Sequence, residues 1–369
     1  MPSPNDAAAS TPDGSSSADV VVVGAGIVGC ALAAFLAEAG ASVLLVERDE
    51  VGAAASGRNS GILQHPMDAA LAPLFDASLA DYRSLGEHGF TLPDEPHGIL
   101  VVAPPALGVV DELAAFPELR AEPLAPGEPA RIEPVLAPDL AGVRLHTGYP
   151  VGAGAATRAF AARARAAGAR IETGAAAALA PGGVTVAGVR RSAGAVVVAA
   201  GPWTPELVDP TGSWRPIAPL WGVVVEMRLD RPPRHAFEEA GIDQLVASGG
   251  DPPPLFSLVT TGAVSALGST FLRERPDAEA LAPLLRERGA RFVPALAGTA
   301  LGAARACARP LSADGLPLLG RAPGHDDVFV AAGHGPWGVS LGPASARVVA
   351  DLVLGRAAAP PPAFDPGRF

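Results

Sequence analysis

The sequence contains no lysine, and this absence limits the chemistry that the chain can perform. Covalent catalysis through a Schiff base needs a lysine amine, so this mechanism is excluded. Acidic residues outnumber basic ones, and the formal net charge is -11 at pH 7. Binding to a nucleic-acid phosphate backbone needs a positive surface, so we expect no nucleic-acid partner.

Cysteine is also scarce, with two residues in the whole chain. Cys30 and Cys307 lie far apart, so no disulfide framework is predicted, which suits a cytoplasmic location. Residues 1–18 lack the basic region of a signal peptide and are predicted to be a disordered tail. The uncharged run at residues 20–37 resembles a membrane span, but its three glycines favour a soluble element. We expect no integral membrane segment and no metal site.

Residues 19–50 have the pattern of a strand, a glycine turn, a helix and a second strand that ends in a carboxylate. Such a βαβ unit is typical of dinucleotide-binding proteins. Gly24 permits the tight turn, Gly26 lets the backbone approach a pyrophosphate, and Gly29 lets the helix pack on the strand. The pyrophosphate would lie on the helix N-terminus, and Glu47 would accept hydrogen bonds from ribose hydroxyls. The motif predicts an adenine dinucleotide and leaves NAD and FAD open.

Residues 52–66 are rich in glycine and small polar side chains, so they are predicted to form a loop that wraps the ligand, the alternative being an ordinary surface loop. The strand predicted at 193–200 ends in a glycine turn at Gly201, where ligands approach an open α/β sheet. Residues 305–320 are predicted to be rich in turns. Helices are predicted at 76–88, 107–116, 155–167 and 278–292, with a last helix that ends near 355.

A long strand at 219–229 is predicted to begin an antiparallel section, with partners at 256–259 and 263–268 joined by a hairpin turn. The fold class that we expect is α/β, with a Rossmann-like dinucleotide-binding domain interleaved with a smaller α+β substrate domain built on an antiparallel sheet. The first domain is predicted to comprise 19–95, 146–213 and 300–357, the second 96–145 and 214–299, and the C-terminal tail 358–369.

Four motifs in this order resemble those of the D-amino-acid oxidase superfamily of FAD-dependent oxidoreductases, in particular the branch with glycine oxidase, sarcosine oxidase and bacterial D-amino-acid dehydrogenases. They are the glycine triplet with Glu47, the loop Ser56–Gly61, Ala200–Trp203, and Arg309-Pro310 followed by Asp314-Gly315 and Gly333-His334. The similarity extends from residue 19 to about 357 and implies FAD. The implied cofactor-binding residues are Gly24, Gly26, Gly29, Glu47, Arg48, Ser56, Arg58, Asn59, Ser60, Gly61, Ala200, Gly201, Trp203, Cys307, Gly333, Gly335 and Gly338.

The resemblance also implies two catalytic residues, Arg309 and His334. Arg309 stands where the family has an arginine that binds the substrate carboxylate through two parallel hydrogen bonds, although a salt bridge between domains is an alternative role. His334 lines the active site or holds its loop. The helix N-terminus at 335–338 would stabilise negative charge on the flavin during reduction.

For several cysteine, histidine and tryptophan side chains, a role in the site and a role in core packing are both considered. Cys307 falls where sarcosine oxidase has a cysteine bonded to the flavin, but a small apolar filler is favoured. Cys30 is expected to pack in the core, and His65 is not expected to bind the flavin covalently. Trp221 and Trp337 either wall the pocket or belong to the core.

The leading hypothesis for function is FAD-dependent oxidation of a small amino or imino acid, in which a hydride passes to flavin N5 and the imine product hydrolyses. A 2-hydroxy-acid dehydrogenase and a flavin-binding subunit that needs a partner are the alternatives. The lysines that activate oxygen in sarcosine oxidase are absent, and Tyr82 and Tyr149 lie outside the strands that carry active-site tyrosines in related oxidases. The electron acceptor is therefore open between O2 and another molecule, and a homo-oligomer is left open.

Overall fold

The computed structural model of the chain describes residues 17–103, 116–241 and 253–369. The predicted βαβ unit forms the centre of a first sheet, in which β1 pairs in parallel with β2 on one side and with β11 on the other. β1, β2 and β18 are buried along nearly their whole length, as expected for parallel strands covered on both faces. In spatial order the sheet contains β17 (Leu318–Arg321), β18 (Val328–Ala332), β11 (Val189–Val198), β1 (Ala18–Val23), β2 (Val43–Val46) and β8 (Arg170–Glu172), while β10 (Gly183–Val186) and β9 (Ala177–Ala180) extend from β11 as a ribbon.

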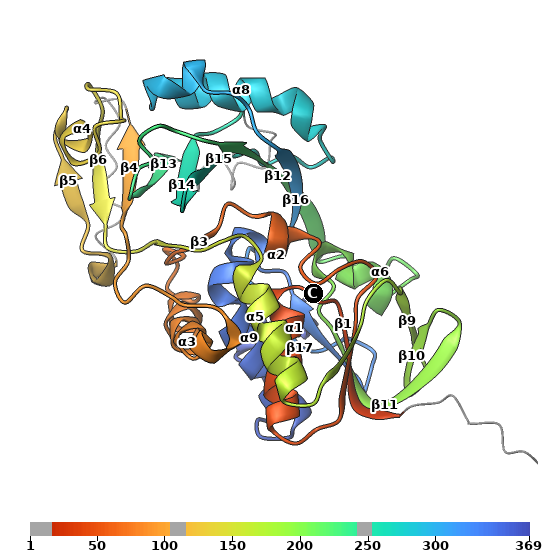
Figure 1. Cartoon of the computed structure of the whole chain (residues 1–369). Coiled ribbons are helices and arrows are strands. Elements are labelled where there is room, and N and C mark those ends of the chain that lie inside the picture. Colours follow the sequence, from red (N-terminus) through yellow and green to blue (C-terminus); the bar gives the residue numbers. More distant parts are fainter. Residues whose placement is uncertain (1–16, 104–115, 242–252) are drawn as a thin grey trace, which may run out of the picture.

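Three helices, α1, α5 and α9, cover one face of this sheet, and a fourth, α3, packs against α9 (Figure 1). The central helix α1 is alanine-rich and almost wholly buried, because small side chains let α5 and α9 pack closely against it. α6 (Thr204–Val208) packs against β9 and β11. The four helices are α1 (Ile27–Glu38), α3 (Ala72–Arg83), α5 (Ala155–Ala166) and α9 (Gly338–Val353).

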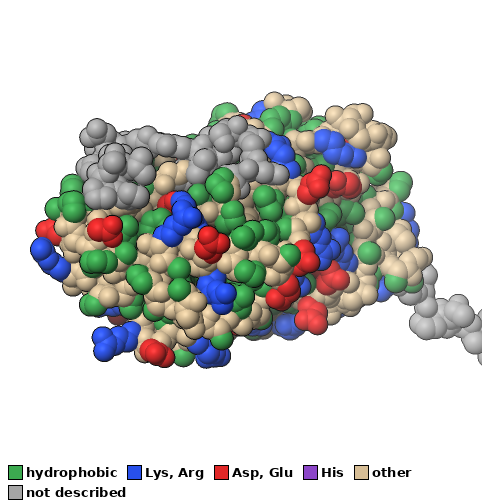
Figure 2. Space-filling model, turned by 90° about the horizontal axis from the view of Figure 1, so that it is seen from above, with side chains coloured by type: hydrophobic (Ala, Val, Ile, Leu, Met, Phe, Trp, Pro, Cys, Tyr) green, Lys and Arg blue, Asp and Glu red, His purple; other side chains and the backbone are tan. Residues whose placement is uncertain are grey.

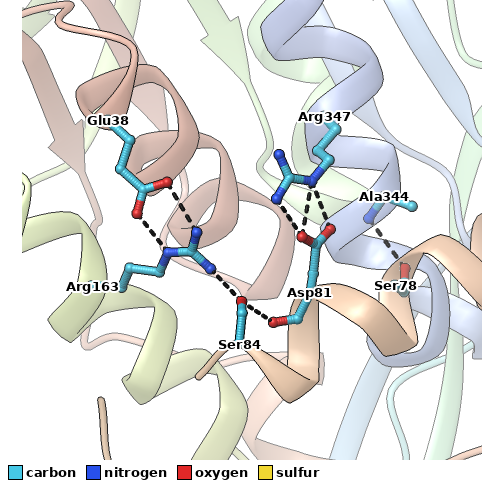
Figure 3. A network of polar contacts seen from close by, with 7 residues as sticks. All are labelled: Glu38, Ser78, Asp81, Ser84, Arg163, Ala344 and Arg347. Atoms are coloured by element: carbon cyan, nitrogen blue, oxygen red, sulfur yellow. Dashed lines mark hydrogen bonds and ion pairs between the residues drawn. The ribbon is translucent and has the colours of Figure 1, made fainter. Parts of the chain in front are cut away.

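A polar network ties these four helices together (Figure 3). Arg163 Nε donates to Glu38 Oε1 at 2.6 Å, and its Nη1 donates to Ser84 Oγ at 2.9 Å. Arg347 Nε donates to Asp81 Oδ2 at 2.9 Å, and Asp81 is only 5% exposed. The Asp81 carboxylate is thus buried and depends on Arg347 as its counter-ion, whereas the Glu38 carboxylate that pairs with Arg163 is partly exposed to solvent.

A second sheet lies above the first domain, with α8 (Ala278–Ala290) packed on its outer face (Figure 1). Its strands pair antiparallel except for β13 and β4, which are parallel. The predicted hairpin is confirmed, because β14 and β15 pair on either side of Gly262. The strands in spatial order are β16 (Ala304–Ser312), β12 (Ile217–Met227), β15 (Val264–Gly268), β14 (Ser257–Thr261), β13 (Ala236–Glu239), β4 (Ile99–Ala103), β6 (Ala141–Leu145) and β5 (Glu122–Leu124).

Short elements connect these two layers. A two-stranded sheet and α2 lie between the sheets in Figure 1. The face seen from above carries acidic and basic side chains side by side, without a large patch of one sign among its described residues (Figure 2). The short elements are α2 (Ala55–Arg58), β3 (Ile62–Leu63), η1 (Gly86–His88), η3 (Pro117–Leu119), α4 (Glu128–Ile132), β7 (Tyr149–Pro150), η4 (Gly201–Trp203), η5 (Pro294–Gly298), η6 (Gly335–Trp337), η7 (Pro362–Phe364) and η8 (Pro366–Arg368).

Two predictions about the C-terminal part are wrong. The segment predicted as turn-rich begins with the nine-residue strand β16, which pairs with β12 from Ile217 to Val225. Residues 304–312 therefore belong to the second sheet, although they were predicted to belong to the first domain. Residues 358–369 are not a tail, since Phe364 is buried in the core of the first domain and Arg368 Nε donates to Asp314 Oδ2 at 2.7 Å.

Other boundaries differ less. The helix predicted at 76–88 runs instead as α3, followed by the short turn η1. The helix predicted at 107–116 lies almost entirely outside the described residues, as do positions 1–16 of the predicted N-terminal tail, and β1 already begins at Ala18. Within the described part of the chain, no helix is long and apolar enough to cross a membrane.

Candidate active site

A cavity of about 1450 Å3 lies between the carboxyl ends of the strands of the first sheet and the inner face of the second sheet. Ligands bind at this edge in open α/β folds, because loops after neighbouring parallel strands converge there. Most of the predicted site residues line this cavity. They are Gly24, Gly26, Glu47, Arg48, Ser56, Asn59, Ser60, Ala200, Gly201, Trp203, Cys307, Arg309, His334, Gly335 and Gly338, whereas Gly29, Arg58, Gly61 and Gly333 do not line it.

The three glycines of the first turn meet different surroundings. A Cβ on Gly24, whose φ is +106°, would lie 2.5 Å from Ala199 O, and one on Gly29 would lie 1.9 Å from Gly24 O. Both glycines therefore let helix and strands approach closely. A Cβ on Gly26 would meet only Ser56 Oγ, at 3.1 Å, in the cavity wall at the N-terminus of α1. Gly26 thus keeps open the space in front of the free amides of the helix.

The carboxylate of Glu47 lies beside this turn. Its Oε2 accepts a hydrogen bond from Ala25 N at 2.7 Å, and its Oε1 accepts one from Asp49 N at 3.0 Å. Arg48 places its guanidinium 3.9 Å from the ring centroid of Trp203, and both side chains line the cavity. This cation–π contact joins the end of β2 to the turn after β11.

The loop after β2 holds its shape through its own side chains. Asn59 Nδ2 donates to Ser56 O at 2.8 Å, and Asn59 Oδ1 accepts from Gly61 N at 2.7 Å. Ser56 Oγ accepts from Ile27 N at 2.9 Å and so fastens the loop to the start of α1. Arg58 turns away from the cavity, with Nε donating to a carbonyl oxygen of the same loop at 2.8 Å. Arg58 and Gly61 therefore shape the loop without lining the cavity.

Arg309 lies on β16 with its guanidinium at the cavity. Its Nη1 donates to Thr270 O at 2.9 Å, its Nη2 donates to Ser269 Oγ at 2.7 Å, and the guanidinium carbon lies 4.7 Å from the centroid of Phe271. Burial lowers the pKa of Arg309, although arginine stays charged near neutral pH. Over residues 17–103, 116–241 and 253–369 no carboxylate lies within 4.0 Å of it. Among the described residues Arg309 therefore makes no salt bridge between domains.

His334 also lines the cavity and is 2% exposed. Its Nε2 has no hydrogen-bond partner among the described residues. Burial lowers the pKa of His334 to about 4, so its imidazole is neutral at neutral pH. Gly335 and Gly338 follow at the turn into α9, whereas Gly333, with φ +87°, packs against Leu318 instead of lining the cavity.

Both cysteines are buried in the structure. Cys307 Sγ lies 3.8 Å from Ala55 O, and burial raises the pKa of its thiol despite the nearby Arg309. A thiol with a raised pKa is a poor nucleophile, which agrees with the favoured role as a small apolar filler at the cavity wall. Cys30 is fully buried in α1, and its pKa is also raised by burial.

Of the remaining histidine and tryptophan candidates, Trp337 alone lines the cavity, and Trp221 is half-buried on β12. His65 Nδ1 accepts from Met67 N at 3.1 Å, and its ring does not line the cavity. Trp337 lines the cavity. Trp221 does not, and Arg275 lies 5.6 Å above its ring. The two tyrosines, Tyr82 and Tyr149, are buried in the hydrophobic core of the first domain.

Sequence reasoning did not single out several polar groups of the cavity. The Oε1 atom of Gln64 is buried at the wall without a hydrogen-bond partner among the described residues, so it needs a donor from a ligand or water. Ser269 and Thr270 contact Arg309 but lie about forty positions before it in the sequence. Gly222 is the residue near Arg309 that the sequence could have indicated, because a glycine inside a β-branched strand often marks a place where another group approaches the backbone closely.

These residues fit a bound FAD. The space at Gly26, the helix N-terminus behind it and the Glu47 carboxylate suit a pyrophosphate and ribose. The unpaired Gln64 and His334 atoms can hydrogen-bond to the polar edge of a flavin. Fold and cavity together are those of a dinucleotide-dependent oxidoreductase, and the side chain of Arg309 lies at the cavity.

The chain belongs to the family of FAD-dependent oxidoreductases, whose model matches residues 19–352. It is 31% identical over 371 residues to glycine oxidase of Geobacillus kaustophilus, covering 91% of this chain and 92% of that protein. To glycine oxidase of Pseudomonas aeruginosa it is 30% identical over 197 residues, covering 51% of this chain and 49%, about half, of that relative. The crystal structure of the Geobacillus enzyme matches with a TM-score of 0.77 and 26% identity over 95% of this chain and 97% of the other. The resemblance, the fold class and FAD as cofactor are thereby confirmed, and the chain is an oxidoreductase of the amino-acid oxidase type.

Proposed function

We propose that this chain oxidises a small amino or imino acid at the carbon that bears the nitrogen, giving an imine that hydrolyses. The observation that carries the proposal is the guanidinium of Arg309, a cation at the cavity without a carboxylate partner in the described part of the chain. A substrate carboxylate would complete it through two parallel hydrogen bonds, which fix angle as well as distance. Bound FAD supplies flavin N5 as the acceptor of the hydride that leaves the substrate carbon.

His334 and α9 complete this proposed site. Because the imidazole of His334 is neutral, Nε2 can take part in a hydrogen bond without placing a second positive charge beside the substrate. The N-terminus of the sixteen-residue helix α9 lies at the cavity wall and favours negative charge there. We therefore assign binding and orientation to Arg309, and hydrogen bonding at the reacting end to His334.

Anaerobic mixing of the purified protein with amino acids of both chiralities, N-methyl amino acids and 2-hydroxy acids tests the chemistry. The readout is the flavin absorbance at about 450 nm, a wavelength set by the cofactor itself. Bleaching by an amine class supports the proposal, and bleaching by 2-hydroxy acids alone would replace it with a 2-hydroxy-acid dehydrogenase. Bleaching by no compound until a partner protein is added would indicate a flavin-binding subunit. Admitting air afterwards separates transfer to O2 from transfer to another acceptor.

The role of Arg309 has its own test. Arg309→Ala removes a bidentate charged contact, so we expect the KM for the substrate to rise at least about tenfold while FAD stays bound. Arg321→Ala, which removes an exposed arginine on β17 away from the cavity, is the matched control and should leave KM unchanged. An unchanged KM in Arg309→Ala would remove this residue from the site.

A further inference from the structure

The guanidinium of Arg309 rests in a seat built from Gly222, Ser269, Thr270 and Phe271. The guanidinium donates hydrogen bonds to Thr270 O and Ser269 Oγ. Its carbon lies 4.7 Å from the centroid of the Phe271 ring. A guanidinium has five N–H donors. Two are used by the seat, so three remain for a ligand, enough for a bidentate carboxylate.

Gly222 is a glycine because of this side chain and not because of its backbone. Its φ lies outside the left-handed region, so another residue could adopt its conformation. A Cβ at this position would, however, lie 2.3 Å from Arg309 Nη2 and 2.5 Å from the guanidinium carbon. Distances below about 3 Å force one group to move, so the guanidinium can lie here only above a glycine.

The two residues that accept hydrogen bonds from Arg309 are themselves fixed to the second sheet. The hydroxyl of Thr270 donates to Trp221 O at 3.2 Å and accepts from Val223 N at 3.0 Å, so it bridges the residues on either side of Gly222. The backbone of Ser269 exchanges two hydrogen bonds with Leu255, at 2.7 and 2.9 Å. Ser269 and Thr270 are both buried, so the seat is rigid.

We propose that Gly222 and Ser269 are positioning residues that fix the orientation of the Arg309 guanidinium and thereby select substrates by the location of their carboxylate. The inference rests on the proposed function, in which Arg309 binds that carboxylate. Gly222 supplies the space, and Ser269 supplies the acceptor that stops the planar group from rotating. Because the guanidinium is held before the ligand arrives, little rotamer freedom is lost when a carboxylate binds.

The test uses the FAD-loaded enzyme and an unreactive carboxylate, acetate, whose binding is followed through the change that it causes in the flavin spectrum. Gly222→Ala and Ser269→Ala should each weaken acetate binding about tenfold or more, since each misplaces or releases a charged donor. Ser269→Thr keeps the hydroxyl and should restore affinity to within about twofold of the original. Gly298→Ala, where a Cβ meets open space in η5, is the matched glycine control.

Activity supplies the second readout. With an amine substrate, KM should rise in parallel with the acetate Kd, while FAD content and melting temperature stay unchanged. If Gly222→Ala and Ser269→Ala bind acetate with the original affinity while Arg309→Ala binds it more weakly, the positioning role of Gly222 and Ser269 is wrong. The role of Arg309 in binding the carboxylate would then still stand. Original affinity in Arg309→Ala would overturn the proposed function itself. If Ser269→Thr binds as weakly as Ser269→Ala, the hydroxyl is not the positioning contact and that part of the inference is wrong.

Discussion

Alanine at two glycines of the first turn should have separable effects, one on the stability of the protein and the other on its affinity for FAD. In Gly29→Ala the new methyl would overlap the backbone carbonyl of Gly24, so helix α1 must move away from the strand. In Gly26→Ala the methyl would point into the cavity, where its nearest neighbour is the Ser56 hydroxyl at 3.1 Å. The first change affects the folded protein, and the second affects the ligand.

The magnitudes follow from these contacts. Overpacking of this kind costs about 1–3 kcal/mol, which lowers the melting temperature by several degrees, so Gly29→Ala should destabilise the protein even without FAD. Gly26→Ala should change the stability of the FAD-free protein by less than about 0.5 kcal/mol. It should cost at least one charge-assisted hydrogen bond to the pyrophosphate, about 1.5–3 kcal/mol, and raise the Kd for FAD about tenfold to a hundredfold.

Calorimetry of the FAD-free protein and fluorescence titration with FAD measure the two effects separately. Gly86→Ala is the control, because a Cβ there meets open space. The reasoning would be refuted if Gly26→Ala lowered the melting temperature of the FAD-free protein as much as Gly29→Ala. It would also be refuted if Gly26→Ala bound FAD as tightly as the original protein, since the pyrophosphate could then not lie at this turn.

Three further predictions concern side chains around the site and the helices. Acid precipitation should release the flavin, because burial keeps the Cys307 thiol protonated; yellow precipitate would show a covalent link. Since the pKa of His334 is about 4 in the folded protein, below its ordinary 6.5, the unfolded chain takes up the proton first. Urea unfolding of the FAD-free protein should therefore show stability falling by up to about 3 kcal/mol from pH 6.5 to pH 4, and His334→Asn should lack this slope. Arg347→Ala, which leaves the buried Asp81 carboxylate unpaired, should cost about 2 kcal/mol or more in unfolding free energy. Arg163→Ala leaves the Glu38 carboxylate, which water can reach, and should cost less than about 1 kcal/mol; equal losses would show that the burial of the remaining carboxylate does not decide the cost.

The parts of the fold that the sequence predicted are those with local signals. The βαβ unit is marked by a β-branched strand, a glycine turn and an alanine-rich helix within one short stretch. The hairpin around Gly262 is marked by two apolar runs with turn residues between them. In both cases the hydrogen-bond partners lie close together in the chain, so the pattern contains the information that the structure uses.

β16 lacks such a local signal. Arg305, Arg309 and Pro310 interrupt its apolar pattern, because the arginines serve the loop and the cavity instead of the core. Its strand conformation comes from pairing with β12, whose paired residues lie 79 to 95 positions earlier. The same holds for the seat of Arg309: the family resemblance located the arginine, but the groups that hold it come from Gly222 and from the segment after β15. Only the three-dimensional pairing brings them together.

The strand order of the first sheet also has a consequence for the synthesis of the protein. β1 can pair with β2 as soon as both have left the ribosome, but its other neighbour, β11, ends at Val198, and β18 ends only at Ala332. One edge of β1 therefore stays unpaired in the nascent chain until β11 is made, and one edge of β11 stays unpaired until β18 is made. Completion of this sheet must therefore wait for the last part of translation, and a chain that stops before β18 would lack the strand beside β11.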